Sequence, residues 1–352
     1  MADATTIAEF AGRLEAYLGG VTRGSVQISK LTRLTGGASR DTWSLDATIV
    51  GGPDAGVHRL ILRRDMGGEI QPHALSRGQE FRILQVMWDA GVRLARPRWL
   101  CEDPTVLGVS FFLVDRLEGE SVGRRIAREN SLASGRRLLP EQMGEQLARI
   151  HSVDAHSAGL TFLPKFPGAA SPAARAVASA RVQLDELGEP HPVLEWALRW
   201  LERKAPPCPR LVTVHGDFRI GNLMVGPDGL RGIFDWEFCH VGDPAEDLAW
   251  PCVRSWRFGQ DKLHLGGIGQ FEEFYAAYRA AGGCAVEPSS VRFWEIMGNV
   301  RWALGCISQA HRHLSGQAPS VELASLGRRA AEMEAELLLL IDEELVVAQA
   351  SP

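Results

Sequence analysis

Length, composition and charge narrow the classes of protein to which this chain can belong. It has 352 residues, of which 45% are hydrophobic and 23% charged, as in an ordinary globular protein long enough for two lobes. Its 38 basic and 43 acidic residues give a net charge of −5, which argues against a nucleic-acid-binding surface.

Cysteine spacing and hydropathy exclude further classes. The six cysteines are scattered, without a C-x-x-C pair or a Cys/His cluster of zinc-site spacing. The first residues, MADATTIAEF, lack the basic and apolar regions of a signal peptide. No apolar run approaches the roughly 20 residues that a membrane span needs. We therefore expect a reduced, cytoplasmic protein with no membrane or nucleic-acid partner; the sequence does not indicate an oligomeric state.

The first third of the chain has the periodicity of a small, mainly β lobe. We predict a helix over 5–18 that ends at Gly19-Gly20, strands over 26–31, 57–64 and 109–114, and a helix over 77–90. A glycine-rich turn at residues 36–39 joins two of the strands, and glycines there allow backbone amides to approach a phosphate. Such a turn is also simply typical of a hairpin.

The remainder of the chain is predicted to be mainly helical. We expect helices over 139–152, 172–187, 191–204, 268–281, 288–314 and 320–348. The C-terminal region mixes tryptophans such as Trp256 and Trp302 with arginines such as Arg301, which suits an anionic or partly apolar ligand. Glu332, Glu334 and Glu336 could instead line a pocket for a polycation, although a solvated helix face is the preferred interpretation for most of them.

Residues 211–250 carry the most informative pattern: LVTVHGDFRIGNLMVGPDGLRGIFDWEFCHVGDPAEDLAW. Short apolar strands alternate there with polar loops, and Asp217, Asn222 and Asp235 stand at strand ends. Phosphoryl transfer needs such a set, because one aspartate accepts the proton of the attacking hydroxyl while an amide oxygen and a second carboxylate hold Mg²⁺. A single carboxylate in such a place would more often be a turn former.

The motif H-G-D-x-x-x-x-N followed by D-W-E resembles the catalytic core of the aminoglycoside phosphotransferase/choline kinase family, and the longer block is most similar to the kinase-like domain fused to some acyl-CoA dehydrogenases. The resemblance covers roughly residues 30–340. It implies an α+β, protein-kinase-like fold with two lobes. These are a small antiparallel-β lobe over 1–115 and a large, mainly helical lobe over 116–352, joined by a hinge at 115–119.

The resemblance also implies roles within the block. Asp217 is the expected catalytic base, and Asn222 and Asp235 are the expected metal ligands. His215 is expected to pack and bond the loop backbone. Asp247 is expected to brace the loop, and Asp243 to form a turn or a helix N-cap. His151, at the end of the helix over 139–152, is expected to be structural, as a helix-end cap.

In the first lobe the resemblance implies a nucleotide site between the lobes. Its phosphate-loop candidates are Gly36, Gly37, Ser39 and Arg40. Arg63 stands where kinases have a phosphate-gripping lysine, and Glu80 is its expected ion-pair partner, although both could be surface residues. The hinge strip Phe112–Leu117, with Val114, Asp115, Arg116 and Leu117, is expected to bind the adenine through its backbone.

The sequence therefore predicts an ATP- and Mg²⁺-dependent kinase of a small-molecule hydroxyl, with GTP as the alternative nucleotide. A hydroxyacyl thioester or hydroxy acid is the preferred acceptor, and an aminoglycoside or other antibiotic is the alternative. A nucleotide-binding pseudokinase without transfer activity stays open because Arg63 replaces the lysine. A metal-dependent phosphohydrolase using His215, Asp217, Asp235 and His240 is a further alternative that the few histidines disfavour.

Overall fold

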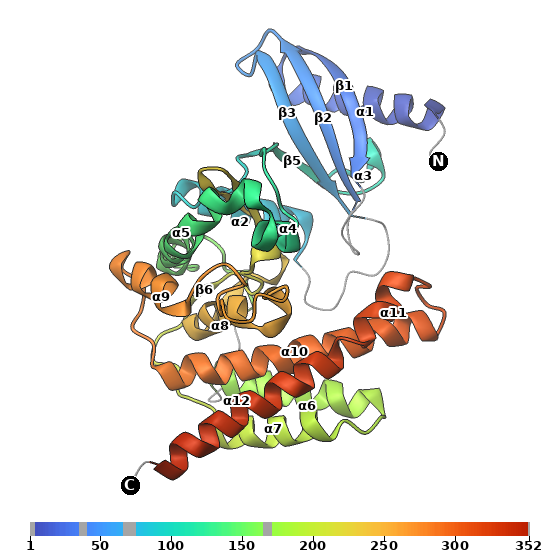
Figure 1. Ribbon diagram of the computed structural model, residues 1–352. Coiled ribbons are helices and arrows are strands. Elements are labelled where there is room, and N and C mark those ends of the chain that lie inside the picture. The colour runs from blue at the N-terminus through green and yellow to red at the C-terminus, as the bar shows by residue number, and fades with distance from the viewer. Residues whose placement is uncertain (1–3, 35–40, 66–74, 165–170, 351–352) are drawn as a thin grey trace. The chain divides into compact units, whose positions relative to one another are not determined.

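A computed structural model describes residues 4–34, 41–65, 75–164 and 171–350 (Figure 1). The chain separates into two compact units. The first comprises Met1–Gly119 and Arg231–Phe238, and the second comprises Glu120–Leu230 and Cys239–Pro352. The predicted division at the hinge did not include the return of residues 231–238 to the first unit.

A five-stranded antiparallel sheet forms the body of the first unit, in the order β1-β2-β3-β5-β4. Its strands are β1 (Ser25–Leu34), β2 (Asp41–Val50), β3 (Gly56–Arg64), β4 (Pro97–Cys101) and β5 (Phe111–Asp115). Alternate apolar side chains of β2 and β3 pack with Leu14 and Leu18 of helix α1 (Ala4–Thr22), and this burial holds the helix to the sheet.

Helix α1 does not end at Gly19-Gly20, so the prediction of a stop there is wrong. Glycine costs a helix only about 1 kcal/mol relative to alanine, and packing outweighs that amount here. Leu18 is fully buried, and the buried Thr22 hydroxyl donates to the Leu18 carbonyl at 2.7 Å. The helix therefore continues to Thr22, and the backbone turns at Arg23 with φ of 57°.

Helix α2 (Arg77–Asp89) completes the first unit, together with the short α3 (Pro104–Leu107). Ser76 caps α2 in a capping box, because its hydroxyl accepts from the Gln79 amide while the Gln79 side chain accepts from the Ser76 amide. The ring of Phe81 lies 5.8 Å from that of Phe112 on β5. This packing fixes the first turn of α2, which carries Glu80, relative to the sheet.

The second unit is mainly helical. Its helices are α4 (Gly123–Arg128), α5 (Ala133–Ser152), α6 (Pro172–Leu187), α7 (Pro192–Lys204), α8 (Pro244–Ala249), α9 (Phe271–Ala280), α10 (Pro288–Leu314), α11 (Val321–Gly327) and α12 (Ala330–Ala350). Figure 1 shows α10 and α12 running side by side over α6 and α7. Helices α5 and α9 approach so closely that a Cβ on Gly144 would lie 2.3 Å from the Phe274 carbonyl oxygen.

One of the predicted helices is divided into two helices in the structure. The segment 320–348 forms α11 and α12, with a break at Arg328 and Arg329. Gly327 ends α11 where a Cβ would lie 2.7 Å from that of Ala310, and the Arg329 guanidinium donates to the Ser255 carbonyl at 3.2 Å. These tertiary contacts redirect the chain at a point where the helical periodicity alone continues.

The block at 211–250 contains the predicted short strands. Strand β6 (Val212–Val214) pairs with β9 (His240–Gly242), and β7 (Leu223–Gly226) pairs with β8 (Gly229–Ile233). The antiparallel sheet of one unit and the helices of the other confirm the predicted α+β class. Every helix among the described residues is too short or too polar to span a lipid bilayer.

Candidate active site

Arg63 lies at the centre of a charge cluster in the first unit. It occupies the last part of β3, and its guanidinium contacts two carboxylates: Glu80 Oε1 at 3.3 Å and Asp235 Oδ1 at 2.6 Å. The expected Arg63–Glu80 ion pair is therefore present. Burial disfavours the charge of Arg63, but Glu80, Asp235 and Glu237 outweigh burial and raise the pKa of Arg63 above its usual range. The side chain is thus a fixed cation.

Glu80 has a second guanidinium partner that sequence reasoning missed. Arg77, one turn earlier on α2, forms an ion pair with Glu80 and contacts Asp65 Oδ1 at 2.9 Å. Glu80 is fully buried, and a buried carboxylate is stable only when it is paired and hydrogen-bonded. The spacing of three residues on a helix, which places Arg77 beside Glu80, was a usable signal.

Asp235 has an unusual backbone. It follows β8 in the segment that returns to the first unit, and its φ is 58°, in the left-handed region that non-glycine residues seldom adopt. Its side chain is 36% exposed, and its Oδ1 contacts Arg63. Residues held in this conformation often cluster at functional sites.

In the second unit, Asp247 braces the loop that follows β6. Its carboxylate accepts from the His215 amide at 2.6 Å and from the Gly216 amide at 2.9 Å. Gly216 has φ of 83°, which favours glycine, and the His215 ring accepts from the Asp217 amide at 3.2 Å. The expected bracing by Asp247 and the expected backbone contact of His215 are therefore confirmed.

Helix α8 presents Asp247 to the loop. Asp243 caps this helix by accepting from the Ala245 amide at 2.9 Å, as predicted. His151 does not simply cap α5, because its buried ring lies 3.3 Å from Asp247 Oδ2 and 2.9 Å from the Tyr278 hydroxyl. It therefore supports the carboxylate that holds the loop, which the helix-end prediction did not foresee.

Asp217 is held by three side chains. Arg219 Nε donates to its Oδ1 at 2.9 Å, and Trp250 Nε1 donates to the same oxygen at 2.6 Å. Asn222 Nδ2 donates to Oδ2 at 2.6 Å and to the Asp217 carbonyl at 2.9 Å. Since Oδ1 already accepts two hydrogen bonds, Oδ2 keeps the open lone pair. Trp250 and Arg219 were not predicted as partners of Asp217.

Asn222 and Asp235 offer oxygen atoms of the kind that Mg²⁺ prefers. Because the amide nitrogen of Asn222 donates both of its hydrogen bonds to Asp217, its Oδ1 is the atom available to a metal. Asn222 belongs to the second unit and Asp235 to the first. The chemistry of the donor set fits a hard divalent cation.

The hinge candidates are held within the first unit. Arg98 forms a two-pronged ion pair with Asp115, and Arg116 bonds Ser44 and Asp46. The amides of Asp115 and Arg116 donate to the Arg96 and Arg59 carbonyls. Val114 lies in β5, and Leu117 lies close to Gly232. The adenine contact assigned to this strip stays a prediction, as does the phosphate loop, because Gly36, Gly37, Ser39 and Arg40 lie outside the described residues.

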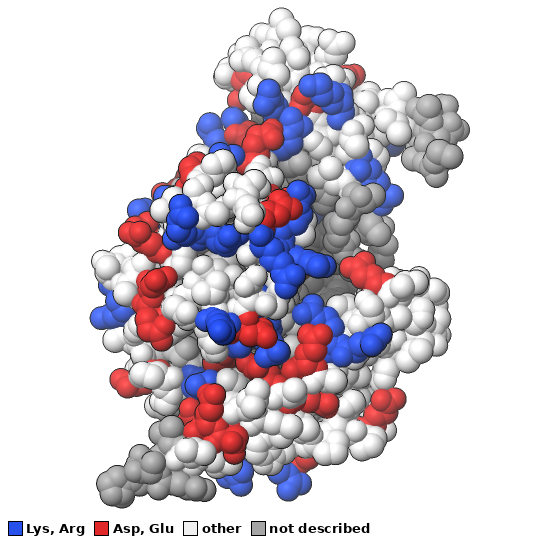
Figure 2. Space-filling view, in the orientation of Figure 1, with Lys and Arg blue, Asp and Glu red and all other residues white. Residues whose placement is uncertain are grey.

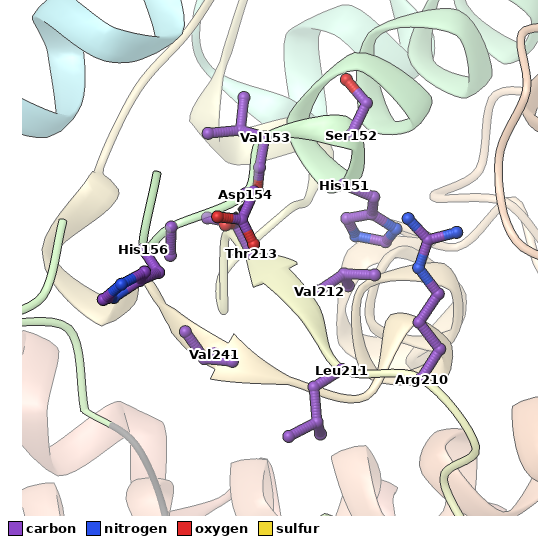
Figure 3. Close-up of a pocket in the computed structure, with 11 residues that line it drawn as sticks. His151, Ser152, Val153, Asp154, His156, Arg210, Leu211, Val212, Thr213 and Val241 are labelled. Carbon is purple, nitrogen blue, oxygen red and sulfur yellow. Dashed lines mark hydrogen bonds between the residues drawn. The ribbon is translucent and has the colours of Figure 1, made fainter. Parts of the chain in front are cut away.

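A pocket of about 290 Å³ opens at the C-terminal end of α5 (Figure 3). His151, Asp154, Arg210 and Thr213 are among its lining residues, and Figure 3 shows the Arg210 side chain extending beside the His151 ring. Asp217 and Asn222 are not part of the lining. The pocket is therefore distinct from the group of side chains around Asp217.

A model of the Phosphotransferase enzyme family (APH) matches residues 30–294. Acyl-CoA dehydrogenase family member 10 of Mus musculus is 30% identical over 244 residues, which are 62% of this chain and 21% of that protein. Acyl-CoA dehydrogenase family member 11 of Gallus gallus is 28% identical over 306 residues, 80% of this chain and 38% of that protein. The chain thus spans well under half the length of these curated relatives.

Solved structures share the fold. A putative aminoglycoside phosphotransferase of Ralstonia eutropha JMP134 superposes with a TM-score of 0.73 at 22% identity, covering 94% of this chain and 98% of that one. Spectinomycin phosphotransferase in complex with ADP and spectinomycin gives a TM-score of 0.58 at 13% identity, with 92% and 97% covered. The predicted kinase-like fold and the predicted family resemblance are confirmed.

Proposed function

Because the chain belongs to the Phosphotransferase enzyme family, we propose that it transfers the terminal phosphate of ATP to the hydroxyl of a small molecule. The observation that carries the proposal is the set of hydrogen bonds that hold the Asp217 carboxylate. The Asp217 carboxylate is fixed by Asn222, Trp250 and Arg219, on a loop braced from below by Asp247, and it keeps an acceptor lone pair on Oδ2. A positioned carboxylate of this kind is what a general base requires.

The proposed roles follow from the side chains. Asp217 Oδ2 orients the acceptor hydroxyl and takes its proton. Arg63, held by Glu80, neutralises charge on the nucleotide phosphates, and its rigid fork replaces the point charge of a lysine. Asn222 Oδ1 and Asp235 would hold Mg²⁺, which supplies charge neutralisation on the phosphates when it is bound. Proteins of similar fold include one determined with ADP, which supports nucleotide binding by this chain.

For the acceptor, we prefer a hydroxyacyl thioester or a hydroxy acid. The two curated relatives are named as acyl-CoA dehydrogenase family members, which associates this kind of chain with acyl chemistry. Solved structures of similar fold are named for aminoglycosides and spectinomycin, so an antibiotic is the alternative acceptor.

One observation favours a pseudokinase as a second candidate. Arg63 Nη2 contacts Asp235 Oδ1 at 2.6 Å, so the guanidinium already neutralises a carboxylate that a metal would need. An arginine holds its charge under all ordinary conditions and competes with Mg²⁺ for that oxygen. A pseudokinase would bind nucleotide with little dependence on Mg²⁺ and would transfer no phosphate.

The test is an acceptor screen. The purified chain is incubated with Mg-ATP and hydroxyacyl-CoAs, hydroxy acids, aminoglycosides, choline or sugars, and release of ADP is followed above the acceptor-free rate. Transfer to an acceptor, lost when Mg²⁺ is chelated, supports the proposal. Nucleotide binding by calorimetry without ADP release for any acceptor would favour the pseudokinase instead.

A further inference from the structure

Three tryptophans extend away from Asp217 within the second unit, and the proposed transfer step does not use two of them. Trp250 donates to Asp217 Oδ1, and its ring centroid lies 5.6 Å from that of Trp256. The centroid of Trp256 lies in turn 4.7 Å from that of Trp302 on α10. We refer to Trp250, Trp256 and Trp302 as the tryptophan row.

Two arginines stack on the row. The Arg219 guanidinium lies 4.4 Å from the Trp256 ring centroid while its Nε donates to Asp217. The Arg301 guanidinium lies 5.1 Å from the Trp250 centroid and donates to Glu246 at 2.6 Å. Each cation is thus matched by one carboxylate, so the arginines add hydrogen-bond donors to the row without adding net charge.

The row contains two donors that the described residues leave without a partner. Nε1 of Trp256 and Nε1 of Trp302 are both buried, and neither has a hydrogen-bond partner among the described residues. Trp256 is only 4% exposed, so its N–H group has little access to solvent. An unpaired buried donor destabilises the folded chain, and two such donors on adjacent rings beside a proposed base favour a partner other than the described residues.

Helix α10 leaves room for such a partner. Gly298, Arg301, Trp302 and Gly305 share one face of this helix by their spacing. At Gly298 that face is packed, because a Cβ would lie 2.7 Å from Val253 and 3.3 Å from Trp250. Two turns later a Cβ on Gly305 would meet nothing within 4 Å. Space is therefore open at Gly305, three residues after Trp302 on the same helix.

We propose that the hydroxyl acceptor binds along the tryptophan row, with Nε1 of Trp256 and Nε1 of Trp302 donating to a carbonyl or carboxylate of the acceptor. The inference rests on the proposed function, because Asp217 must be the base. A hydroxy acid or hydroxyacyl thioester supplies the missing hydrogen-bond acceptors. A polyamine would present donors to donors, and the carboxylates of Asp217 and Glu246 are already paired.

Replacing each indole with a phenyl ring tests the proposal. Trp256→Phe and Trp302→Phe keep an aromatic ring but delete the N–H donor and part of the indole, so the melting temperature should fall by the amount that the smaller ring causes. Binding of 3-hydroxybutyrate and 3-hydroxybutyryl-CoA in the presence of Mg-ADP, measured by calorimetry, should weaken about 5- to 20-fold, as expected for one lost hydrogen bond. Mg-ADP binding should stay unchanged, which shows that the nucleotide site is intact.

Trp294→Phe is the matched control. The indole of Trp294 donates to Asp243 at 3.1 Å, so its loss removes a satisfied bond and should lower the melting temperature without weakening the probes. Unchanged probe binding in both the Trp256 and the Trp302 variant would overturn the proposal. So would binding of kanamycin in preference to both carbonyl probes, or failure of both probes to bind.

A second variant fills the open space. Gly305→Leu replaces a weak helix former in α10 and should raise thermal stability, while the added side chain should weaken 3-hydroxybutyryl-CoA binding about tenfold. Unchanged affinity would contradict an acceptor site there. Transfer of phosphate to kanamycin alone would contradict acceptor binding along the tryptophan row, but it would agree with the kinase proposal. Absence of transfer to any acceptor would instead count against the kinase proposal itself.

Discussion

At the scale of single residues, Asp217 is held by Arg219, Asn222 and Trp250, and this support fixes the orientation of its carboxylate. The motif identified Asp217 and Asn222 because they are close in sequence and joined by a hydrogen bond that spans only a loop. Trp250 stands 33 residues further along, so its bond to Asp217 depends on the placement of α8 and the turn after it. In the same way the Arg63–Glu80 pair follows from a known pattern, whereas the role of Arg77 emerges only from the burial of Glu80.

At the same scale, Asp235 offers a direct test of metal binding. Asp235→Asn keeps the shape of the side chain and removes its charge, so Mg²⁺-dependent ATP affinity should fall about 10- to 100-fold, while ATP binding without Mg²⁺ should not weaken. Calorimetry with and without Mg²⁺ measures both. Asp46→Asn, which alters another paired carboxylate of the first unit, is the control. An unchanged Mg²⁺ dependence in Asp235→Asn would contradict the metal-ligand role.

Among the elements, those governed by their own periodicity were predicted well. Helices α6 and α10 have the predicted bounds because capping signals and apolar spacing agree along their whole length. The wrongly predicted helix ends lie where tertiary contacts determine the end of the helix. Packing of Leu18 and Thr22 carries α1 past two glycines, and the contacts of Gly327 and Arg329 divide α11 from α12. Local sequence does not encode these contacts.

Helix α8 should stabilise the loop that carries Asp217, because Asp247 on this helix binds the loop backbone. In Asp247→Asn the side chain loses the negative charge that accepts from the His215 and Gly216 amides, and its NH₂ group faces one of these buried donors. The free energy of unfolding should therefore fall by about 2–4 kcal/mol. Asp103→Asn is the control, because the exposed Asp103 caps α3 through the Thr105 amide at 2.8 Å and asparagine is an equally good N-cap. Urea unfolding measures both; equal stability of the two variants would contradict the bracing role.

For the molecule as a whole, the net charge of −5 gives only an expectation about the class of ligand, and the pairing of the charges is seen only in the structure. Figure 2 shows acidic and basic side chains intermingled on the drawn face of the helical unit. Inside that unit, Arg257 bridges the buried Glu295 and Glu336 at 3.1 and 2.8 Å, with His264 beside them. These four residues could not be grouped from sequence because they come from separate segments.

His264 makes the stability of the folded chain pH-dependent. Burial, followed by the charges of Arg257 and Arg292, lowers the pKa of His264 from 6.5 to about 4. Between about pH 6.5 and 4, His264 is protonated in the unfolded chain and neutral in the folded chain. The free energy of unfolding therefore decreases as pH falls through this range. In His264→Asn this loss should shrink by about 1 kcal/mol, since the partly exposed ring is screened. Urea unfolding between pH 4 and 7 measures it, with the exposed His156→Asn as control; equal pH dependence of all three proteins would contradict the assignment.

The most direct measurement is the effect of Asp217→Ala on both binding and turnover, made on the best acceptor from the screen. The account predicts that Mg-ATP affinity by calorimetry stays within about twofold while phosphate transfer falls by about 10²- to 10⁴-fold, the usual contribution of a positioned base. Transfer at the wild-type rate with intact nucleotide binding would contradict it, because the fixed carboxylate would then have no part in the reaction.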